Sequence, residues 1–185
     1  MGKIILVTGG ARSGKSKFAE KLALKLGNGR AAYIATAQIF DEEMAHRIKL
    51  HKERRGKNWL TFESPFNADK TISYAAENFD VILFDCVTIY LGNFLCAADI
   101  DDVEKINCDA ENLIGALINA AENSNATIIF VSNEVGAGIV PENKLARIFR
   151  DIAGLANQQI AAHAEKVFMT VAGIAVDIKN LEFKI

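Results

Sequence analysis

The sequence predicts an α/β fold, in which helices cover both faces of a mostly parallel sheet. Short, continuous apolar runs, typical of strands buried on both faces, alternate with longer segments of helical periodicity. Strands that alternate with helices in this way form parallel sheets. The chain has 185 residues and no repeat, low-complexity stretch or linker, so we expect residues 1–185 to form a single domain.

The first half of the chain supplies two strands and two helices. Residues 4–8 are an apolar run bounded by glycines, which predicts a buried strand. Residues 16–26 have apolar side chains at helical spacing and end next to Gly27, so a helix is expected there. A second apolar run predicts a strand over 31–36. Residues 41–55 begin with acidic and end with basic side chains, as the helix dipole favours, and are expected to be helical.

The second half of the chain repeats the alternation. It predicts a strand, a helical stretch, a long amphipathic helix, a strand, a helix and a final strand, over 81–84, 85–95, 102–122, 127–132, 141–164 and 166–171. Pro141 would stand in the first turn of its helix, where the missing N–H is no loss. Ligands of parallel sheets bind beyond the carboxyl ends of the strands. Functional residues are therefore expected in the loops that follow Thr8, Thr36, Phe84 and Ser132.

Composition argues against several classes of partner. The formal net charge is −2 and the sequence pI about 5.9, so the basic surplus of a typical nucleic-acid-binding protein is absent and no nucleic acid partner is expected. The apolar run at the N-terminus is too short for a signal peptide or a membrane span, and we expect a cytoplasmic protein. Cys86, Cys96 and Cys108 lack metal-ligand spacing and are expected to be small buried hydrophobic residues.

Residues 9–16, GGARSGKS, match the phosphate-loop pattern GxxxxGK[ST] in full, directly after a strand and directly before a helix. In this pattern backbone N–H groups and the helix N-terminus bind phosphate oxygens. Lys15 is expected to reach the β- and γ-phosphates as a catalytic residue, and Ser16 to ligate Mg²⁺. The motif predicts a RecA-like P-loop NTPase domain that binds GTP or ATP with Mg²⁺. The expected nucleotide contacts here are Gly9, Gly10, Ala11, Arg12, Ser13, Gly14, Lys15 and Ser16.

Asp85 follows the apolar run 81–84, which is the position of the acidic residue that holds Mg²⁺ in P-loop proteins. An alternative role is that of a helix N-cap, since helical sequence follows. With the phosphate loop present, the metal role is favoured. A switch GTPase is excluded, because Thr88 stands where its DxxG motif has glycine and residues 143–146 lack the aspartate of its NKxD motif.

A basic segment, residues 44–55, contains a candidate nucleophile. If the segment is helical, Arg47, His51 and Arg55 lie on one face. The two arginines would keep the imidazole of His51 neutral and nucleophilic, and they would attract a triphosphate. A covalent phosphohistidine or nucleotidyl-histidine intermediate requires such a residue. The alternative is a solvated basic helix face, which the pattern alone favours.

Several motifs occur together in a familiar order. They are GGARSGKS, YIATAQ at 33–38, RIKLHKERR at 47–55 with Trp59 and Glu63 downstream, DCVTIYLGN at 85–93, and the segment 133–179. Along nearly its whole length the chain resembles the bifunctional adenosylcobinamide kinase / adenosylcobinamide-phosphate guanylyltransferase family of cobalamin biosynthesis. The segment 133–179 is the most specific part of the resemblance, since many enzymes share the phosphate loop.

The resemblance implies two reactions. Such enzymes phosphorylate the aminopropanol hydroxyl of adenosylcobinamide, and then transfer GMP from GTP to that phosphate through a GMP-histidine intermediate. The family's histidine precedes a lysine in the motif R-I-x-x-H-K, which implies catalysis by His51 and not by His46. A trimer is also implied. Some members carry Ser where this chain has Ala37, and Glu where it has Asp85. The further nucleotide contacts implied are Ala35, Thr36, Ala37, Lys52, Glu53, Arg54, Arg55, Glu63 and Asp85.

Alternatives to this interpretation remain open. A simple small-molecule kinase would use the phosphate loop alone, with His51 incidental to the reaction. A GTP-binding regulatory module would bind nucleotide and leave corrinoids untouched. One further residue has two possible roles, because Glu134 follows the strand over 127–132. It could orient or deprotonate an acceptor hydroxyl, or it could anchor its own loop by a hydrogen bond.

Overall fold

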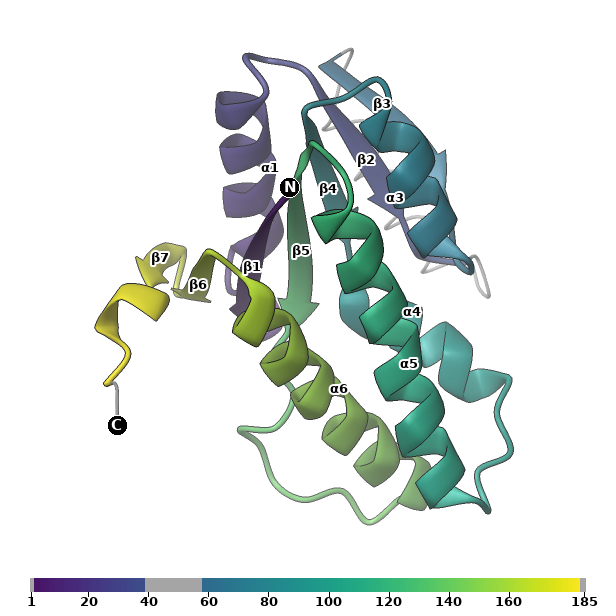
Figure 1. Ribbon diagram of the computed structural model, residues 1–185. Helices are drawn as coiled ribbons and strands as arrows, with labels where there is room; N and C mark the ends of the chain where they lie inside the picture. Colours follow the sequence, from purple (N-terminus) through teal and green to yellow (C-terminus); the bar gives the residue numbers. More distant parts are fainter. Residues whose placement is uncertain (1, 39–57, 184–185) are drawn as a thin grey trace.

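The computed structural model describes residues 2–38 and 58–183 (Figure 1). The strands in these ranges are β1 (Lys3–Gly9), β2 (Ala31–Ala35), β3 (Trp59–Glu63), β4 (Val81–Asp85), β5 (Thr127–Asn133), β6 (Lys166–Val171) and β7 (Ile174–Asp177). The helices are α1 (Lys15–Leu26), α3 (Ala68–Ala76), α4 (Val87–Cys96), α5 (Val103–Glu122), α6 (Lys144–His163) and the 3₁₀ helix η2 (Lys179–Leu181).

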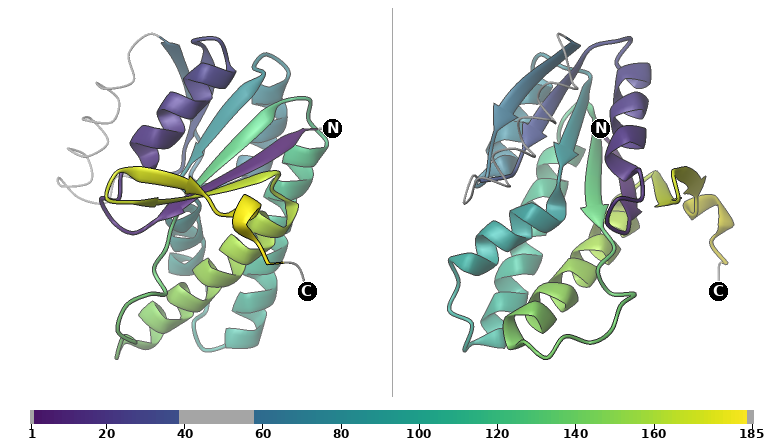
Figure 2. Two further views of the ribbon diagram at one scale, coloured as in Figure 1. Left: turned by 90° about the vertical axis from the view of Figure 1, so that its left-hand side faces the viewer. Right: turned by 180° about the vertical axis from the view of Figure 1, so that it is seen from behind.

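The strands of the described residues form one seven-stranded sheet in the order β3-β2-β4-β5-β1-β6-β7. Neighbouring strands are parallel, except that β6 and β7 are antiparallel. Helices α3, α5 and α6 cover one face of the sheet and α1 covers the other (Figures 1 and 2). The predicted α/β fold, with a mostly parallel sheet and helices on both faces, is confirmed.

The two covered faces explain why the central strands read as continuous apolar runs. In β1, Ile4 and Leu6 pack in the cluster that contains α3, α5 and α6. Ile5 and Val7 point to the other side and pack with α1. Successive side chains of a strand alternate between faces, so a strand buried on both sides needs an apolar residue at every position.

Four elements of the described residues, the strands β3 and β7, the helix α3 and the 3₁₀ helix η2, lie outside the predicted set. β3 and β7 are the two edge strands of the sheet, each with one strand neighbour. Side chains of both are exposed, for example Leu60 at 51% and Ile174 at 68%. Edge strands therefore lack the fully buried pattern on which the strand predictions depend. The helix predicted over 41–55 lies outside the described residues.

The start of α6 corrects one prediction. The helix begins at Lys144 and not at Pro141. Asn143 is the N-cap, and its Oδ1 accepts a hydrogen bond from the backbone N–H of Ala146 at 3.0 Å. A capping asparagine satisfies an N–H group of the first turn, so Asn143 fixes the start of the helix two residues after Pro141. Pro141 lies in the loop before the helix.

The cysteines correct a second prediction. Cys86 is buried as expected, but Cys96 and Cys108 are exposed. Cys96 is the last residue of α4, where the helix leaves the core. Cys108 lies outside the buried stripe of α5, which runs through residues such as Ile106 and Ala110. Of the described helices, none is both long and apolar enough to cross a membrane.

Candidate functional site

The carboxyl edge of the parallel strands brings the predicted loops together. At the end of β1, Gly9 is level with Asn133 of β5. On the other side of β5, Val131 is level with Asp85 of β4. The phosphate loop therefore begins beside the ends of β5 and β4, at the edge where open parallel sheets bind ligands.

Two glycines allow the backbone path of the phosphate loop. Gly9 has a φ of +154° and Gly14 a φ of +98°, a region that side-chain-bearing residues rarely adopt. A Cβ atom on Gly9 would lie 2.4 Å from the carbonyl oxygen of Thr170. A Cβ atom on Gly14 would lie 3.1 Å from the Cα atom of Gly173. These glycines thus permit both the turn and the close packing of the loop.

The hairpin formed by β6 and β7 supports the phosphate loop from outside. The hydroxyls of Ser13 and Thr170 are 3.0 Å apart, and Thr170 donates its own proton to the carbonyl oxygen of Thr8 at 3.0 Å. Ser13 is therefore the donor in the first bond. The backbone N–H of Gly173 donates to the carbonyl oxygen of Ser13 at 2.8 Å. The Ser13 side chain, predicted to contact nucleotide, is engaged with this hairpin.

Lys15 is the first residue of α1 and is buried, with 8% of its surface exposed. Its Nζ donates to the carbonyl oxygen of Gly10 at 3.1 Å, within the phosphate loop. Burial lowers the pKa of Lys15, and the nearby carboxylate of Asp85 acts in the opposite direction. A phosphate group in the loop would add a further negative charge beside this ammonium group and so favour its charged form.

Asp85 lies at the end of β4, and its Oδ2 accepts a hydrogen bond from the Tyr33 hydroxyl at 2.8 Å. The alternative role as N-cap of α4 does not apply, because Cys86 holds that position and no side chain caps the helix. No three His, Cys, Asp or Glu side chains form a metal cluster within the described parts of the chain. A Mg²⁺ ion held by Asp85 and Ser16 would need phosphate oxygens and water as its other ligands, and these two side chains suit that mode of binding.

Thr36 ties the end of β2 to the end of β4. Its side chain is completely buried, and its hydroxyl accepts from the Cys86 N–H at 2.8 Å and donates to the Cys86 carbonyl at 2.9 Å. Asn93 adds a bond from its Nδ2 to the carbonyl oxygen of Thr36 at 2.8 Å. Burial raises the pKa of Cys86 to about 11, so its thiol stays protonated at neutral pH. The Thr36 side chain, predicted to contact nucleotide, is thus part of the scaffold.

The other predicted nucleotide contacts spread along the sheet edge. Ala35 and Glu63 are level with each other at the ends of β2 and β3. β3 is four strands away from β1, which is about 19 Å at the usual strand spacing. This distance places Glu63 beyond the reach of phosphates in the loop. Ala37 follows β2 and is partly buried. The predicted residues outside the described part of the chain are His51, Lys52, Glu53, Arg54 and Arg55.

Glu134 anchors the loop that follows β5. Its Oε1 accepts a hydrogen bond from the Gly136 N–H at 2.6 Å. Its own backbone N–H donates to the carbonyl oxygen of Gly9 at 3.0 Å and so joins this loop to the start of the phosphate loop. Of the two roles open for Glu134 from the sequence, the structure shows the loop-anchoring hydrogen bond.

A polar group next to this loop was not identified from the sequence. Asn133 donates from Nδ2 to the Thr88 hydroxyl at 2.7 Å, and Asn157 donates from Nδ2 to the carbonyl oxygen of Asn133 at 3.2 Å. The sequence does carry one signal, since Asn133 directly follows a predicted buried strand. Its partners in α4 and α6 are set by tertiary packing and leave no local pattern.

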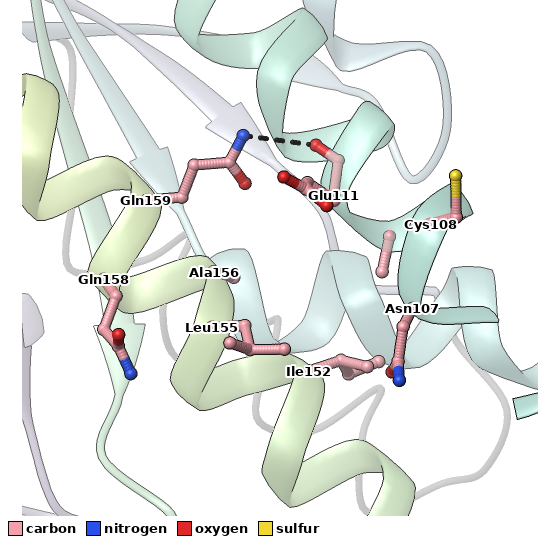
Figure 3. Close-up of a pocket in the computed structure, with 9 residues that line it drawn as sticks. Asn107, Cys108, Glu111, Ile152, Leu155, Ala156, Gln158 and Gln159 are labelled. Carbon is pink, nitrogen blue, oxygen red and sulfur yellow. Dashed lines mark hydrogen bonds between the residues drawn. The ribbon is translucent and has the colours of Figure 1, made fainter. Parts of the chain in front are cut away.

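Two surface pockets are lined by other parts of the molecule. A pocket of about 360 Å³ lies between α5 and α6 and combines polar Glu111 and Gln159 with apolar Ile152 and Leu155 (Figure 3). Gln159 crosses it by donating from Nε2 to the Glu111 carbonyl at 3.3 Å. A pocket of about 400 Å³ lies between α4 and α5, beside Phe66. No residue of the phosphate loop lines either pocket, so the nucleotide site is defined by the sheet edge.

The arrangement at this edge is that of a P-loop nucleotide-binding α/β protein, with the phosphate loop after β1 and a carboxylate at the end of β4. Comparison with known proteins shows to which family within this class the chain belongs. The chain belongs to the cobinamide kinase / cobinamide phosphate guanyltransferase family, whose model matches residues 5–178. The family resemblance found in the motifs is confirmed.

Individual relatives match along nearly their full length. The chain is 46% identical over 183 residues to the bifunctional adenosylcobalamin biosynthesis protein CobU of Salmonella typhimurium, covering 95% of this chain and 99% of the relative. It is 41% identical over 175 residues to the bifunctional adenosylcobalamin biosynthesis protein CobP of Pseudomonas aeruginosa, covering 95% and 96%. A solved structure, the flagellar accessory protein FlaH from Methanocaldococcus jannaschii, matches with a TM-score of 0.46 and 18% identity, over 94% of this chain and 74% of that chain.

Proposed function

We propose that the protein phosphorylates the aminopropanol hydroxyl of adenosylcobinamide, and then transfers GMP from GTP to adenosylcobinamide phosphate, giving adenosylcobinamide-GDP in cobalamin biosynthesis. The observation that carries the proposal is a complete phosphate loop, with Lys15 buried near Asp85, in a chain of this family. The names of the curated relatives, which describe bifunctional adenosylcobalamin biosynthesis proteins, support it. We place the reactions in the cytoplasm, where nucleoside triphosphates are made.

In the kinase step, the triphosphate of GTP or ATP lies in the phosphate loop. The Lys15 ammonium leaves the Gly10 carbonyl, which it contacts at 3.1 Å, for the oxygens of the β- and γ-phosphates. Bound Mg²⁺, held by Asp85 and Ser16, would supply further positive charge at these oxygens. Negative charge grows there as the phosphoryl group moves, so a fixed cation stabilises the transition state more than the ground state.

In the guanylyl step, a ring nitrogen of His51 attacks the α-phosphorus of GTP. The bond between that phosphorus and the bridging oxygen breaks, and pyrophosphate leaves with the electron pair. The phosphate group of adenosylcobinamide phosphate then displaces His51 from the GMP. A covalent relay replaces one displacement between two anions by two easier steps. The support for His51 is the motif R-I-x-x-H-K, and we assign Lys52, Glu53, Arg54, Arg55, Ala35, Ala37 and Glu63 to the nucleotide on the same ground.

The experiment that tests the proposal is incubation with α-³²P-GTP and Mg²⁺, followed by a denaturing gel. Wild type and His46→Ala are expected to carry acid-labile label, and His51→Ala is expected to carry none. The histidine at position 46 is a matched control, since it lies in the same segment and outside the motif. If no form is labelled although GTP binds, the guanylyl step is wrong, and transfer of γ-³²P to adenosylcobinamide would leave a simple kinase.

We also propose a homo-oligomer, a trimer by family resemblance. The hairpin supports an association between copies, because Val171 (59% exposed) is level with Ile174 (68% exposed) on one of its faces. Val176 (45% exposed) shares this face with them. Exposed apolar surface of this kind marks many interaction sites. Sedimentation velocity gives the molar mass, and a monomer at micromolar concentration would contradict the proposal.

A further inference from the structure

Asn133 stands between the two parts of the site already described. β5 separates β1 from β4 in the sheet, and Asn133 at its end is level with Gly9. Val131 is level with Asp85, and residues two apart on a strand share a face. The side chain of Asn133 therefore lies on the face that carries Asp85 and α1, between the start of the phosphate loop and the carboxylate.

The amide of Asn133 is held in one orientation. Its Nδ2 donates to the Thr88 hydroxyl at 2.7 Å. Thr88 is 3% exposed in the first turn of α4, and its hydroxyl also contacts the Cys86 Sγ at 3.3 Å, so it has little freedom to move. The backbone carbonyl of Asn133 accepts a hydrogen bond from Asn157 at 3.2 Å. The amide nitrogen and the backbone are thus both engaged with the surrounding helices.

The amide oxygen of Asn133 remains available. Among the described residues no hydrogen bond is made to Oδ1, and this atom is not among the buried polar atoms that lack a partner, such as Ser132 Oγ and Asn157 Oδ1. Oδ1 is thus open to a ligand at the carboxyl edge. It is an acceptor without a charge. It can take a hydrogen bond from a hydroxyl group, but it cannot bind phosphate oxygens, which are acceptors too.

We propose that Asn133 Oδ1 accepts the hydrogen bond of the attacking hydroxyl in the kinase step, and that Thr88 is the positioning residue that fixes the amide for this role. The inference rests on the proposed function and adds the group that orients the hydroxyl of the phosphoryl acceptor. A carboxylate at this position would repel the triphosphate, whereas a neutral amide orients the hydroxyl without that cost. Correct alignment of two reacting groups accounts for a large share of enzymatic rate enhancement.

Phosphoryl transfer exchanges one bond to the γ-phosphorus for another. The hydroxyl oxygen of the acceptor forms a bond to the γ-phosphorus, and the bond from the γ-phosphorus to the β,γ-bridging oxygen breaks. The nucleoside diphosphate leaves with that electron pair. Asn133 holds the hydroxyl proton but does not remove it, because an amide oxygen is a very weak base. In a loose transition state the oxygen carries little positive charge until late, so its proton can pass to water.

The test compares Asn133→Ala, Thr88→Val and the control Asn112→Ala, whose side chain is exposed on α5. Three quantities are measured for each purified full-length protein: transfer of γ-³²P to adenosylcobinamide, nucleotide Kd, and labelling by α-³²P-GTP. Asn133→Ala should lower kcat of phosphoryl transfer about 100-fold. Its nucleotide Kd and its labelling by GTP should stay at the wild-type level. Thr88→Val should also lower kcat of phosphoryl transfer and leave the nucleotide Kd and the labelling by GTP unchanged. Its loss in kcat should be smaller, about 5- to 10-fold, as expected for one hydrogen bond.

For the variant Asn133→Ala, two results would overturn the inference. One is wild-type phosphoryl transfer in Asn133→Ala. The other is a loss that follows a weakened nucleotide Kd, which would mean that Asn133 serves the phosphate loop. If Asn133→Ala does not fold, Thr88→Val decides, since valine keeps the shape of threonine, and full transfer by this variant overturns the role. A wild-type protein that does not phosphorylate adenosylcobinamide contradicts the proposed function instead, so the two failures are distinguishable.

Discussion

Two loops leave neighbouring strands at the same edge of the sheet and differ in how they are held. The phosphate loop after β1 is bonded along its length, through Lys15 to Gly10 and through Ser13 to the β6–β7 hairpin. The loop over 134–143 after β5 is bonded at its ends. Between those ends Ile139 is 96% exposed. The first loop is rigid and polar, and the second presents an apolar tip to solvent.

The difference matches the two kinds of ligand that the proposed reactions need. Every nucleoside triphosphate presents the same phosphates, so a loop that binds them gains from a fixed arrangement of donors. A corrinoid acceptor is large and mostly apolar. We infer that Ile139 and Val140, on the loop joined to Gly9 through Glu134, meet this acceptor. Each loop can be altered without the other, so separate substitutions can test the two roles.

The largest expected effect comes from removing the charge of the rigid loop. Lys15→Met should lower kcat for γ-phosphoryl transfer about 100- to 1000-fold, because it removes a buried cation from oxygens that gain charge in the transition state. The measurement is a steady-state assay with γ-³²P nucleotide. Lys17→Met is the matched control, since Lys17 is exposed on the same helix. Equal rates in Lys15→Met and the control would contradict the role of Lys15.

The sequence predicts the phosphate loop and the strands beside it well. The phosphate loop is a local pattern, and β1 before it and the neighbouring β5 are buried on both faces, so each shows in a few consecutive residues. Asp85 at the end of β4 is predictable for the same reason. Each of these features is dictated by short-range chemistry, the kind that a single sequence records.

What the sequence does not predict depends on packing between distant segments. Thr170 and Gly173 support the phosphate loop from a hairpin more than 150 residues away, and no local pattern marks them. The hydrogen bond from Asn133 to Thr88 joins β5 to α4, and no sequence pattern marks it either. The edge strand β3 leaves no strand pattern in the sequence, because none of its residues is fully buried. These are tertiary effects that override local preference.

A smaller effect is expected from the far end of the second loop. Arg147 in α6 donates from its guanidinium to the backbone carbonyls of Pro141 and Glu142, which fixes that end. Arg147→Met keeps much of the side-chain volume and removes these bonds. The KM for adenosylcobinamide should rise about 3- to 10-fold, as expected for about 1 kcal/mol of lost ordering. The nucleotide Kd should not change, because the phosphate loop keeps its own contacts.

Steady-state kinetics at saturating nucleotide measure this change. Arg150→Met is the control, since Arg150 lies on the same helix and forms an ion pair with Asp151, 65% exposed, at 3.6 Å. Such surface pairs contribute little to stability. A rise in the nucleotide Kd of Arg147→Met would show that the two loops are coupled, and an unchanged KM for the corrinoid would show that the loop over 134–143 does not meet the acceptor.

The smallest effect is a pH dependence that only the rigid loop should show. Burial lowers the pKa of Lys15 in the folded protein from its ordinary 10.5. Between the lowered value and 10.5 the folded state binds fewer protons than the unfolded state, so this residue makes the free energy of unfolding rise with pH in that window. Below the window the cost of burying the charge is present in full. We therefore expect the free energy of unfolding of Lys15→Met to exceed that of wild type by the largest amount near pH 7. The measurement is urea unfolding without nucleotide, from pH 7 to pH 10. If the difference in the free energy of unfolding between the two proteins stays constant with pH, burial of the charged Lys15 has no cost. A bound triphosphate would then have no such cost to offset.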